Sequence, residues 1–463
     1  MKLNYKRTVL VGFAFFLITA FWQAYDAIVP LILTNHFGLP QVTSGFIMSF
    51  DNILAVFLLP VFGALSDKVN TKYGKRTPFI LIGTVIAAIA FVALTFIDNY
   101  QILRLTDEGI PALRELVNLE NEAELQAILT KTFEITKANP LALVGFVATL
   151  LVVLVAMAIF RSPAVALMPD ITPKPLRSKG NAIINLMGTA GGIIVLVLGM
   201  IFATAKNPYM QYTGYVLAVV SVMLVGLIIF IISVKERKWA EEASALEVEA
   251  MGEESAAEGK RTLTKAERRS FLLILLSVAL WYVGYNSITS KYSVYASNIL
   301  SFDYNFTLIV AQIAAVISYI PVGNISSKFG RRKTVLCGVA MLAAAFFIGN
   351  FITASSPEFI MYPLFALAGI GWATINVNSF PMAVELATGS QVGKYTGYYY
   401  TASMSAQIIA PILSGFLYDL FGMRIMFFAF GTLFVALSFV TMFFVKHGDA
   451  EKETEIKELK EEK

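Results

Sequence analysis

The chain has 463 residues, of which 57% are hydrophobic and only 15% are charged, and its mean hydropathy is +0.69. A soluble protein of this length normally carries about a quarter charged residues, so the composition excludes an ordinary soluble globular domain. The net charge of +4 comes from basic residues scattered among short loops, which does not indicate nucleic-acid binding. The single cysteine, Cys337, cannot form an internal disulfide.

The first seven residues include three basic ones and lead into an apolar stretch of about 26 residues, too long for the apolar core of a signal peptide. We therefore expect an uncleaved first transmembrane helix. Further apolar stretches of about 20 residues, the length that spans a bilayer core, recur along the chain. They predict twelve spans, at residues 9–33, 43–65, 78–97, 141–162, 179–202, 212–234, 270–296, 304–326, 334–353, 358–384, 392–417 and 423–445.

These spans predict an all-α membrane protein with twelve transmembrane helices in two pseudo-symmetric six-helix bundles. We expect the protein to function as a monomer. The first bundle covers residues 1–234 and the second covers residues 270–446. A polar linker rich in Glu and Ala, residues 235–269, joins the bundles, and a charged tail follows at 447–463. The long loop at 99–140 is expected to hold an amphipathic helix with apolar positions Leu113, Leu116, Leu119, Leu125, Ile128 and Leu129.

Basic residues gather in the short loops on one side of the predicted membrane. That side carries Lys2, Lys6, Arg7, Lys68, Lys72, Lys75, Arg76, Lys174, Arg177, Lys179, Lys328, Arg331, Arg332, Lys333 and Lys394. Outside the 99–140 loop, the other side has little beyond Lys206, Lys291 and Arg424. Because Lys and Arg mark the cytoplasmic side, both termini are predicted to be cytoplasmic, in a multi-pass protein of the cytoplasmic membrane.

An internal repeat relates the two halves. Gly63-Ala-Leu-Ser-Asp67 and Gly74-Lys75-Arg76 follow the second span, while Gly323-Asn-Ile-Ser-Ser327 and Gly330-Arg331-Arg332 follow the eighth. The offsets are 323 − 63 = 260 and 330 − 74 = 256, whereas Asp170 matches Glu385 at 385 − 170 = 215. The drop of 256 − 215 = 41 is about the size of the 99–140 loop, so one duplication and one insertion explain both offsets.

The first copy of this motif has the features of a gate. A small residue at the end of the second span lets another helix approach closely, and a carboxylate one turn later can bind a basic side chain or a helix N-terminus. Such a contact is made in one conformation and broken in the other. The alternative is an ordinary basic loop with an incidental Asp. The predicted gating residues are Gly63, Asp67, Gly74, Arg76, Asp170, Arg177 and Glu385.

The run GALSDKVNTKYGKRTPFIL, which begins at Gly63, resembles the helix 2–3 loop signature of the major facilitator superfamily, and the resemblance covers nearly the whole chain. More narrowly, its Ser-Asp, Tyr-Gly-basic-basic and Pro-Phe-Ile-Leu elements resemble the sucrose and maltose carriers related to the glycoside–pentoside–hexuronide:cation symporters. The segment from Arg161 through Pro163 and Asp170 to Asn181 is similar to the same group. The resemblance implies cation-driven uptake of a glycoside, such as the disaccharides sucrose or maltose.

Two departures from related carriers bear on the coupling ion and on Arg161. The melibiose-type permeases carry a paired carboxylate for sodium in helix 2, where this chain has Ala55 and Leu59, so protons are expected rather than sodium. Plant sucrose carriers have an Arg where this chain has Val165. From its position, Arg161 has three possible roles: pairing with a carboxylate, binding a sugar hydroxyl, or capping the inner end of its helix; the departure at Val165 argues against the second.

Two carboxylates lie inside the predicted spans, where an ionisable residue points to function. Asp26 and Asp51 both fall roughly 14–16 Å below the same surface, counting 1.5 Å per residue from the helix ends. Neighbouring carboxylates and burial both favour reversible proton binding. The alternative is that each is satisfied separately by nearby polar groups. The predicted proton-coupling residues are Asp26, Asp51 and Arg161.

Aromatic and amide residues inside the spans suit a sugar, which presents apolar C–H faces and a rim of hydroxyls. The predicted substrate-binding residues are Trp22, Gln23, Tyr25, Asn52, Tyr282, Tyr285, Asn286, Gln312, Trp372, Asn376, Asn378, Tyr398 and Gln407, and the wider inventory adds Trp281 and Tyr399. Spacing puts Tyr282, Tyr285 and Asn286 on one helical face. The alternative is that these rings only pack helices together.

The sequence therefore predicts a secondary transporter that carries a small-molecule sugar with protons by alternating access. It contains no phosphate-binding loop with Gly-Lys-Ser/Thr, and its only histidines, His36 and His447, fall in a predicted loop and the tail, so no enzyme site, metal or cofactor is expected. One alternative is a drug or metabolite exporter of the same fold. Another is a membrane sensor or scaffold that transports nothing and would not need Asp51.

Overall fold

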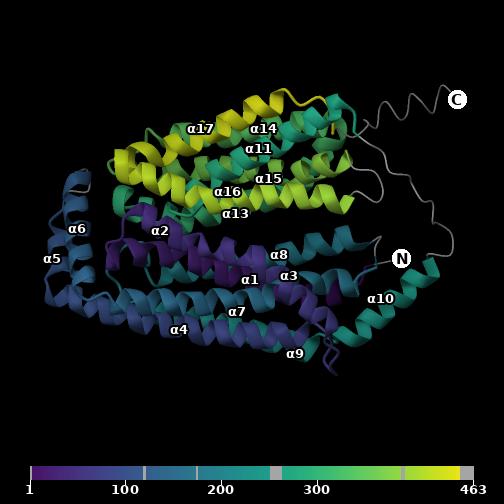
Figure 1. The fold of residues 1–463 in the computed structure, drawn as a ribbon, viewed down its shortest axis with the longest axis horizontal. Coiled ribbons are helices and arrows are strands. Elements are labelled where there is room, and N and C mark those ends of the chain that lie inside the picture. Colours follow the sequence, from purple (N-terminus) through teal and green to yellow (C-terminus); the bar gives the residue numbers. More distant parts are fainter. Residues whose placement is uncertain (1–2, 118–120, 174–175, 251–262, 387–391, 449–463) are drawn as a thin grey trace. The chain divides into compact units, whose positions relative to one another are not determined.

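The computed structural model describes residues 3–117, 121–173, 176–250, 263–386 and 392–448, and helices make up most of them (Figure 1). Within these residues, twelve helical segments are long and apolar enough to cross a membrane, and they correspond to the twelve predicted spans. Several extend beyond their predicted ends, because charged and aromatic residues continue the helix past the apolar core. The third span shows this most clearly, since it runs from Thr77 to Asp107.

The residues cluster into two compact units. Unit 1 comprises residues 1–40, 50–255 and 296–305. Its elements are α1 (Tyr5–Leu31), η1 (Ile32–His36), α3 (Phe50–Lys68), α4 (Thr77–Asp107), α5 (Ile110–Glu115), α6 (Glu122–Ala138), α7 (Leu141–Ile171), α8 (Arg177–Ile201), α9 (Thr213–Ser233), α10 (Glu236–Ala250) and η4 (Ala296–Leu300). Both η1 and η4 are single turns of π-helix.

Unit 2 comprises residues 41–49, 256–295 and 306–463. Its elements are α2 (Gln41–Met48), α11 (Lys265–Thr289), α12 (Tyr292–Tyr295), α13 (Tyr304–Phe329, of which the first two residues belong to unit 1), α14 (Arg331–Gly349), η5 (Glu358–Ile360), α15 (Met361–Glu385), α16 (Val392–Phe421) and α17 (Met423–Phe443). The units therefore exchange short segments across the domain boundaries expected from the sequence. The predicted linker also ends early, because α11 already begins at Lys265.

The second span is broken at Ser49, between α2 and α3. On the unit 2 side, α2 packs closely against α16. A Cβ atom on Gly45 would lie 2.1 Å from the carbonyl oxygen of Pro411, so only glycine fits at this crossing. Asp419 of α16 accepts hydrogen bonds from the backbone N–H groups of Gln41 (2.7 Å) and Val42 (2.8 Å), and thereby caps the N-terminus of α2.

The internal repeat is visible in the backbone. Gly74 and Gly330 both adopt positive φ, +117° and +91°; Gly74 lies three residues before α4, and Gly330 lies directly before α14. One turn before the end of the preceding helix, Ser66 donates to the carbonyl of Gly63 (2.7 Å) and Ser326 donates to that of Gly323 (2.9 Å). Equivalent sequence positions thus have equivalent local geometry, as a duplication predicts.

The long loop at 99–140 is more ordered than a loop with one helix. Within unit 1, α4 continues into it, and α5 and α6 follow as two further helices at the end of the helices opposite to α10 (Figure 1). Leu125, Ile128 and Leu129 are buried, as predicted. The prediction was wrong for Leu113 and Leu116, which are exposed because they lie on the separate helix α5 and in its C-terminal turn, and Leu119 lies outside the described residues.

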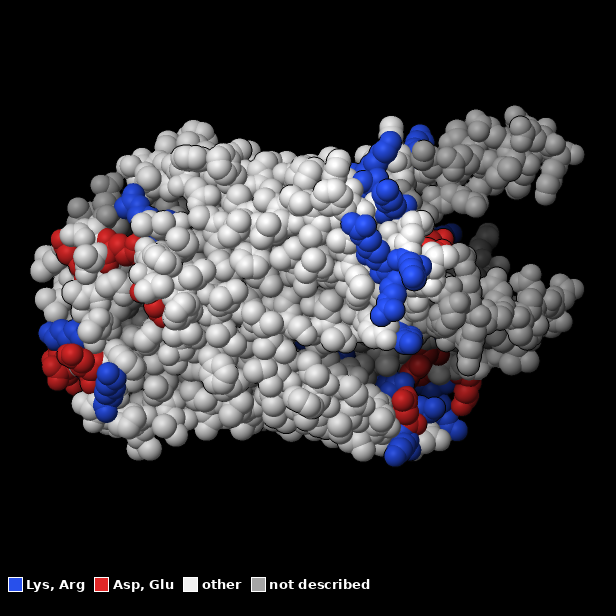
Figure 2. Space-filling model, turned by 45° about the horizontal axis from the view of Figure 1, so that its top comes forward, with Lys and Arg blue, Asp and Glu red and all other residues white. Residues whose placement is uncertain are grey.

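On the surface, most charged side chains lie near the two ends of the helices. On the face shown in Figure 2, Lys and Arg gather near the end where the N-terminus lies, and a wide uncharged belt separates them from the opposite end. Many large apolar side chains are exposed within the spans, among them Ile89, Phe96, Val152, Ile232 and Ile320. An apolar belt of this kind suits a protein whose surrounding solvent is lipid.

The close packing of α2 against α16 gives a prediction. Gly45→Val should push α2 away from Pro411 and destabilise the protein by about 1–3 kcal/mol, the usual cost of overpacking. The measurement is the thermal unfolding midpoint together with hydrogen exchange of residues 41–48. The control is Gly397→Val, on the helix α16 against which α2 packs. A Cβ atom at Gly397 would meet no described atom outside its own helix within 4 Å. Equal effects of both substitutions would contradict the packing account.

Candidate functional site

The charged residues predicted for proton coupling lie together in unit 1. Asp26 of α1, Asp51 of α3 and Arg161 of α7 interact electrostatically with one another. Asp26 is exposed although it lies deep within its span, whereas Tyr25 and Ala27 beside it are buried. Three ionisable groups at this depth are too costly to face hydrocarbon, so they define a polar, water-accessible face of the unit.

Asp51 is placed by the break in the second span. It is the second residue of α3, and its carboxylate accepts hydrogen bonds from the backbone N–H of Asn52 and from Asn52 Nδ2 (2.8 Å). The first turn of a helix presents unpaired N–H groups and favours a negative charge. Asn52, in the first turn of α3, thus provides two donors for a carboxylate within the span.

Aromatic residues of α1 adjoin this triad. The guanidinium of Arg161 lies over the ring of Trp22, 5.5 Å from its centroid, and the ring of Trp22 meets that of Tyr25 edge-on at 5.3 Å. Of the substrate residues predicted in unit 1, Trp22, Gln23 and Asn52 are half-buried, but Tyr25 is fully buried. Tyr25 therefore supports the site from behind, while Trp22 holds Arg161 beside the carboxylates.

A second group of predicted substrate residues lies in unit 2. The rings of Tyr285 and Trp372 stack with centroids 3.7 Å apart and an interplanar angle of 3°, and Tyr282 meets Trp372 edge-on at 5.4 Å. Asn286 and Asn376 each donate Nδ2 to the carbonyl four residues earlier on their own helices. Each of these local bonds uses one of the two hydrogens on Nδ2, so these half-buried amides can offer a ligand the acceptor oxygen Oδ1 and one N–H donor.

The remaining predicted substrate residues separate from this aromatic group. Tyr398 is 44% exposed and lies near Phe271 and Lys394, whereas its neighbour Tyr399 is buried and bonds to Ser379 (2.8 Å) and Tyr282. Tyr399 is thus the tyrosine that joins the group, because adjacent residues on a helix point about 100° apart. Asn378 is 1% exposed and donates to Thr374, which makes it a packing residue. Gln407 and Gln312 are half-buried on α16 and α13.

The predicted gating residues of unit 1 meet at Arg76. Its guanidinium contacts Asp67 and Ser66 of α3, Asp170 of α7 (2.8 Å) and the carbonyl of Gly63 (3.3 Å). Burial lowers the pKa of Arg76, but the hydrogen bonds and charges of Asp170 and Asp67 outweigh burial and raise it above its ordinary value. Arg76 therefore joins three helices through one buried cation.

Sequence reasoning missed Glu236, the first residue of α10 and the start of the linker. Its carboxylate is 3% exposed and accepts hydrogen bonds from the N–H groups of Lys75, Arg76 and Thr77 and from Thr77 Oγ1, at 2.6–2.8 Å. It thereby caps the N-terminus of α4. A Cβ atom on Gly74 would lie 2.3 Å from this carboxyl group, which explains the glycine.

The repeat places a related ion pair in unit 2. Arg331, at the start of α14, bonds to Glu385 at the end of α15 (2.8 Å). Asp170 and Glu385, which the sequence paired by offset, therefore each bind an arginine of the preceding loop. Arg177 donates to the carbonyls of Pro169 and Thr172 and so caps the end of α7, and Lys394 lies over Tyr398.

Lys291 of unit 2 is a further buried charge that the sequence did not single out. It lies just beyond the seventh span, is 0% exposed, and donates to Ser44 Oγ of α2. Burial lowers the pKa of Lys291 to about 7, and the charge of Asp419 opposes part of this shift. Lys291 and Asp419 thus both bind α2, Asp419 at its N-terminus and Lys291 at Ser44 near its middle.

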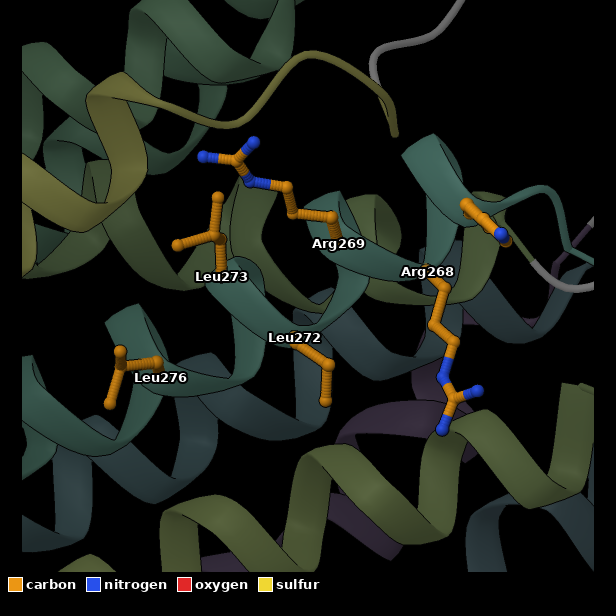
Figure 3. Close-up of a pocket in the computed structure, with 6 residues that line it drawn as sticks. Arg268, Arg269, Leu272, Leu273 and Leu276 are labelled. Atoms are coloured by element: carbon orange, nitrogen blue, oxygen red, sulfur yellow. The ribbon is translucent and has the colours of Figure 1, made fainter.

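The cavity at the start of α11 is a weaker candidate for a binding site. A shallow cavity of about 330 Å³ at the start of α11 is lined by Lys265, Arg268, Arg269, Leu272, Leu273 and Leu276. Arg268 and Arg269 point in different directions (Figure 3), so the cavity has no convergent set of donors. Within the described part of the chain, no group of three His, Cys, Asp or Glu side chains could hold a metal ion.

Comparison with known proteins adds to this geometry. The family model described as Major Facilitator Superfamily matches residues 127–318 and 298–462, and that described as MFS/sugar transport protein matches residues 10–99. The sucrose transport protein SUC3 of Arabidopsis thaliana is 28% identical over 157 residues, 34% of this chain and 23% of that protein. An uncharacterized MFS-type transporter of Methanocaldococcus jannaschii is 22% identical over 179 residues, 38% of this chain and 45% of that one.

The matched segments thus span less than half the length of these two relatives. Among solved structures, a D-xylose-proton symporter superposes with a TM-score of 0.64 and 14% identity, covering 97% of this chain and 100% of that chain. At this identity the likeness shows a shared fold.

The cap on α4 gives a testable prediction. In Glu236→Gln, the amide NH₂ would face N–H donors and the negative charge at the helix N-terminus would be lost, which should destabilise the protein by about 1–3 kcal/mol. The thermal midpoint of the purified protein measures this. Glu241→Gln is the control, because Glu241 is an exposed residue of the same helix paired with Arg237. If both variants melt at the same temperature as the parent protein, the Glu236 carboxylate does not stabilise the N-terminus of α4.

Lys291 predicts a pH dependence. Its pKa of about 7 lies below the roughly 10.4 of a lysine in the unfolded chain, so the unfolded chain binds more protons between these values. Stability should therefore rise from about pH 7 to about pH 10, and Lys291→Met should remove this rise. Unfolding midpoints across this range test it, with the exposed Lys206→Met as control. Identical pH profiles for Lys291→Met and the parent protein would contradict the assignment.

Proposed function

We propose that this chain, which belongs to the Major Facilitator Superfamily, is a secondary transporter that carries a glycoside together with protons. It is a multi-pass membrane transporter and not an enzyme. The observation that carries the proton part of the proposal is the grouping of Asp26, Asp51 and Arg161 on one accessible face of unit 1. The sugar part rests on the aromatic and amide residues described above.

Counting charges explains why this group would bind a proton. Two carboxylates and one guanidinium carry a net charge of −1 when both carboxylates are ionised. One bound proton makes the group neutral, which is the favoured state wherever water is excluded. Loss of the proton leaves a charge that needs hydration, so proton release and water access should occur in the same conformation. Binding and release on opposite sides of the membrane would then drive transport.

Sugar binding is supported by the stacked pair Tyr285–Trp372 in unit 2 and by Trp22 in unit 1. Flat aromatic surfaces suit the C–H faces of a sugar ring, and Asn286 and Asn376 offer acceptor oxygens to its hydroxyls. The similarity of short segments to a sucrose transport protein and of the fold to a D-xylose-proton symporter agrees with this class. We propose a disaccharide such as sucrose or maltose, and protons rather than sodium.

The ion-pair networks are proposed to act as gates. Arg76 with Asp67 and Asp170, and Arg331 with Glu385, join the ends of helices on the side that carries most of the basic loops. By the positive-inside rule this side is assigned to the cytoplasm, together with both termini, in a cytoplasmic membrane. Residues 99–140 then lie outside the cell. Breaking and remaking these pairs would accompany the change of access.

The principal rival is a drug or metabolite exporter of the same fold. It would keep the gates but would need an apolar cavity, and the polar Asp26–Asp51–Arg161 group speaks against one. A sensor or scaffold that transports nothing would gain no advantage from a charged group deep within the spans, because such groups are costly unless they serve a function.

Uptake into membrane vesicles tests the proposal. An imposed proton gradient, acidic outside, should drive accumulation of labelled sucrose or maltose. Asp51→Asn and Asp26→Asn should each lower this accumulation more than tenfold, because an amide cannot take up and release the proton. Asp107→Asn is the matched control, since Asp107 is exposed at the end of α4. Accumulation that persists without the gradient and ignores the substitutions at Asp26 and Asp51 would reject the mechanism.

A further inference from the structure

A second pair of ionisable residues lies in unit 1, away from the Asp26–Asp51–Arg161 group. His36 is the last residue of η1, and Asp98 lies on α4; both side chains are completely buried. His36 Nδ1 lies 2.6 Å from Asp98 Oδ1, and His36 Nε2 lies 2.9 Å from the carbonyl oxygen of Pro208. The pair lies at the end of the unit that carries α5 and α6.

The hydrogen-bond partners fix how many protons the pair holds. A carbonyl oxygen only accepts, so Nε2 must carry a hydrogen. A second proton must then lie between Nδ1 and Oδ1, because a lone pair facing a carboxylate at 2.6 Å would be repulsive. The pair is therefore neutral overall, as imidazolium with carboxylate or as imidazole with carboxylic acid. Loss of that proton would leave an uncompensated charge in a site without water contact, which is costly.

The pair supports the base of the α5–α6 segment. The side chain of Gln101 donates both to the carbonyl of His36 (2.9 Å) and to Thr136 Oγ1 of α6 (3.0 Å). At Gly38, just beyond His36, a Cβ atom would lie 2.5 Å from the backbone of α6. Tyr209 and Tyr212 stack on the imidazole with centroids 6.0 and 5.7 Å away. α6 therefore packs against the backbone beside His36, while the two tyrosines cover its ring.

The same π-helical turn joins the two repeats. Asn35, next to His36, accepts a hydrogen bond from Asn298 Nδ2 of η4 (2.7 Å), and both asparagines are 1% exposed. The offset 298 − 35 = 263 is shared by Gly38 and Ser301, which both have positive φ, so these are equivalent positions of the duplication. Arg114 of α5 completes the contact by donating to the carbonyl of Asn298 (3.5 Å). Turns of π-helix are frequent at functional sites.

We propose that His36 and Asp98 form a second proton-binding site, separate from the coupling carboxylates, whose proton holds η1, the α5–α6 segment and the Asn35–Asn298 contact in the closed arrangement. The ligand is a single proton, taken up when α6 closes over His36. This site does not depend on the identity of the transported substrate or on the role of Asp26 and Asp51.

The pH dependence follows from the proton count. When α6 is lifted, solvated His36 and Asp98 would titrate near their ordinary values of about 6.5 and 3.9. Above about pH 6.5 the open arrangement loses the histidine proton while the closed arrangement keeps it, so the closing equilibrium should weaken by up to tenfold per pH unit. Below about pH 4 the open arrangement gains a proton on Asp98, and closing weakens again. The closed arrangement is thus favoured most between these values.

The other ionisable groups around the pair do not produce this profile. They are Arg104 and Arg114 from α4 and α5, Tyr209 and Tyr212 from the 207–212 loop, and Tyr215 and Tyr304 from α9 and α13. Arginine stays protonated throughout, and tyrosine ordinarily titrates near pH 10. Burial raises the pKa of Tyr209 and Tyr212 further. The described residues of α6 that face the pair, Thr132 and Thr136, do not titrate.

The chain is suited to a direct test because it has only two histidines. Nitrogen-15 NMR of the full-length protein, labelled at histidine and held in detergent micelles, should show His36 with hydrogen on Nε2 and a shared proton at Nδ1 up to pH 8 or above. His447→Gln assigns the remaining signal and is the control. In Asp98→Asn the amide can donate to Nδ1, so His36 should become a neutral imidazole that does not titrate. A His36 signal that titrates freely near pH 6.5 in the parent protein would overturn the proposal.

Cysteine labelling tests the coupling to α6. Thr132→Cys, in a Cys337→Ser background, places a thiol under α6 where Thr132 is 0% exposed, and Gln126→Cys on the exposed face of α6 corrects for the reactivity of the thiol. The corrected labelling rate should rise up to tenfold per pH unit above about 6.5. Adding Asp98→Asn should abolish this rise while the site stays protected, because the amide holds His36 without a proton. A flat parent profile, or an unchanged rise with Asp98→Asn, would refute the proposal.

Discussion

Charge balance at membrane depth is the constraint on which the rest of this structure depends. Asp26, Asp51 and Arg161 share one face of unit 1, and two carboxylates cannot both be neutralised by one guanidinium. These three side chains together carry a net charge of −1 unless a proton is bound. Just after the interruption at Ser49, Asn52 donates its backbone N–H and its side-chain amide to Asp51. A conventional apolar span would tolerate neither the charge nor the break.

The duplication also determines which segments pack together within each unit. Each compact unit contains one short segment from the other repeat: α2 packs on α16 in unit 2, and η4 meets η1 in unit 1. These contacts use few residues, close backbone approaches and buried polar groups. Near the basic loops, each unit has a further polar contact between helices: Arg76 pairs with Asp170 in unit 1, and Arg331 pairs with Glu385 in unit 2. Glu236, in the predicted linker, accepts hydrogen bonds from the N–H groups of Arg76 and Thr77 and so connects the linker to the Arg76 pair.

Sequence alone predicted the features that follow from regular patterns. Hydropathy gave the twelve spans, the repeated loop motif gave the paired positions of Asp170 and Glu385, and helix rise gave the common depth of Asp26 and Asp51. It failed where tertiary contacts decide. Glu236 and His36 are polar residues at helix ends. In the sequence they look like ordinary loop residues, because their hydrogen-bond partners lie far away along the chain. Among three consecutive tyrosines, only the packing of α16 shows that Tyr399 joins Tyr282.

The most direct test of the central claim is proton movement caused by sugar alone. When sucrose or maltose is added outside vesicles with no imposed gradient, the external medium should become more alkaline as protons enter with the sugar. The alkaline shift should vanish in vesicles that carry Asp51→Asn while sugar binding remains. Sugar entry without any pH change, or an undiminished shift in that variant, would contradict the claim that the carboxylates of Asp26 and Asp51 carry the coupling proton.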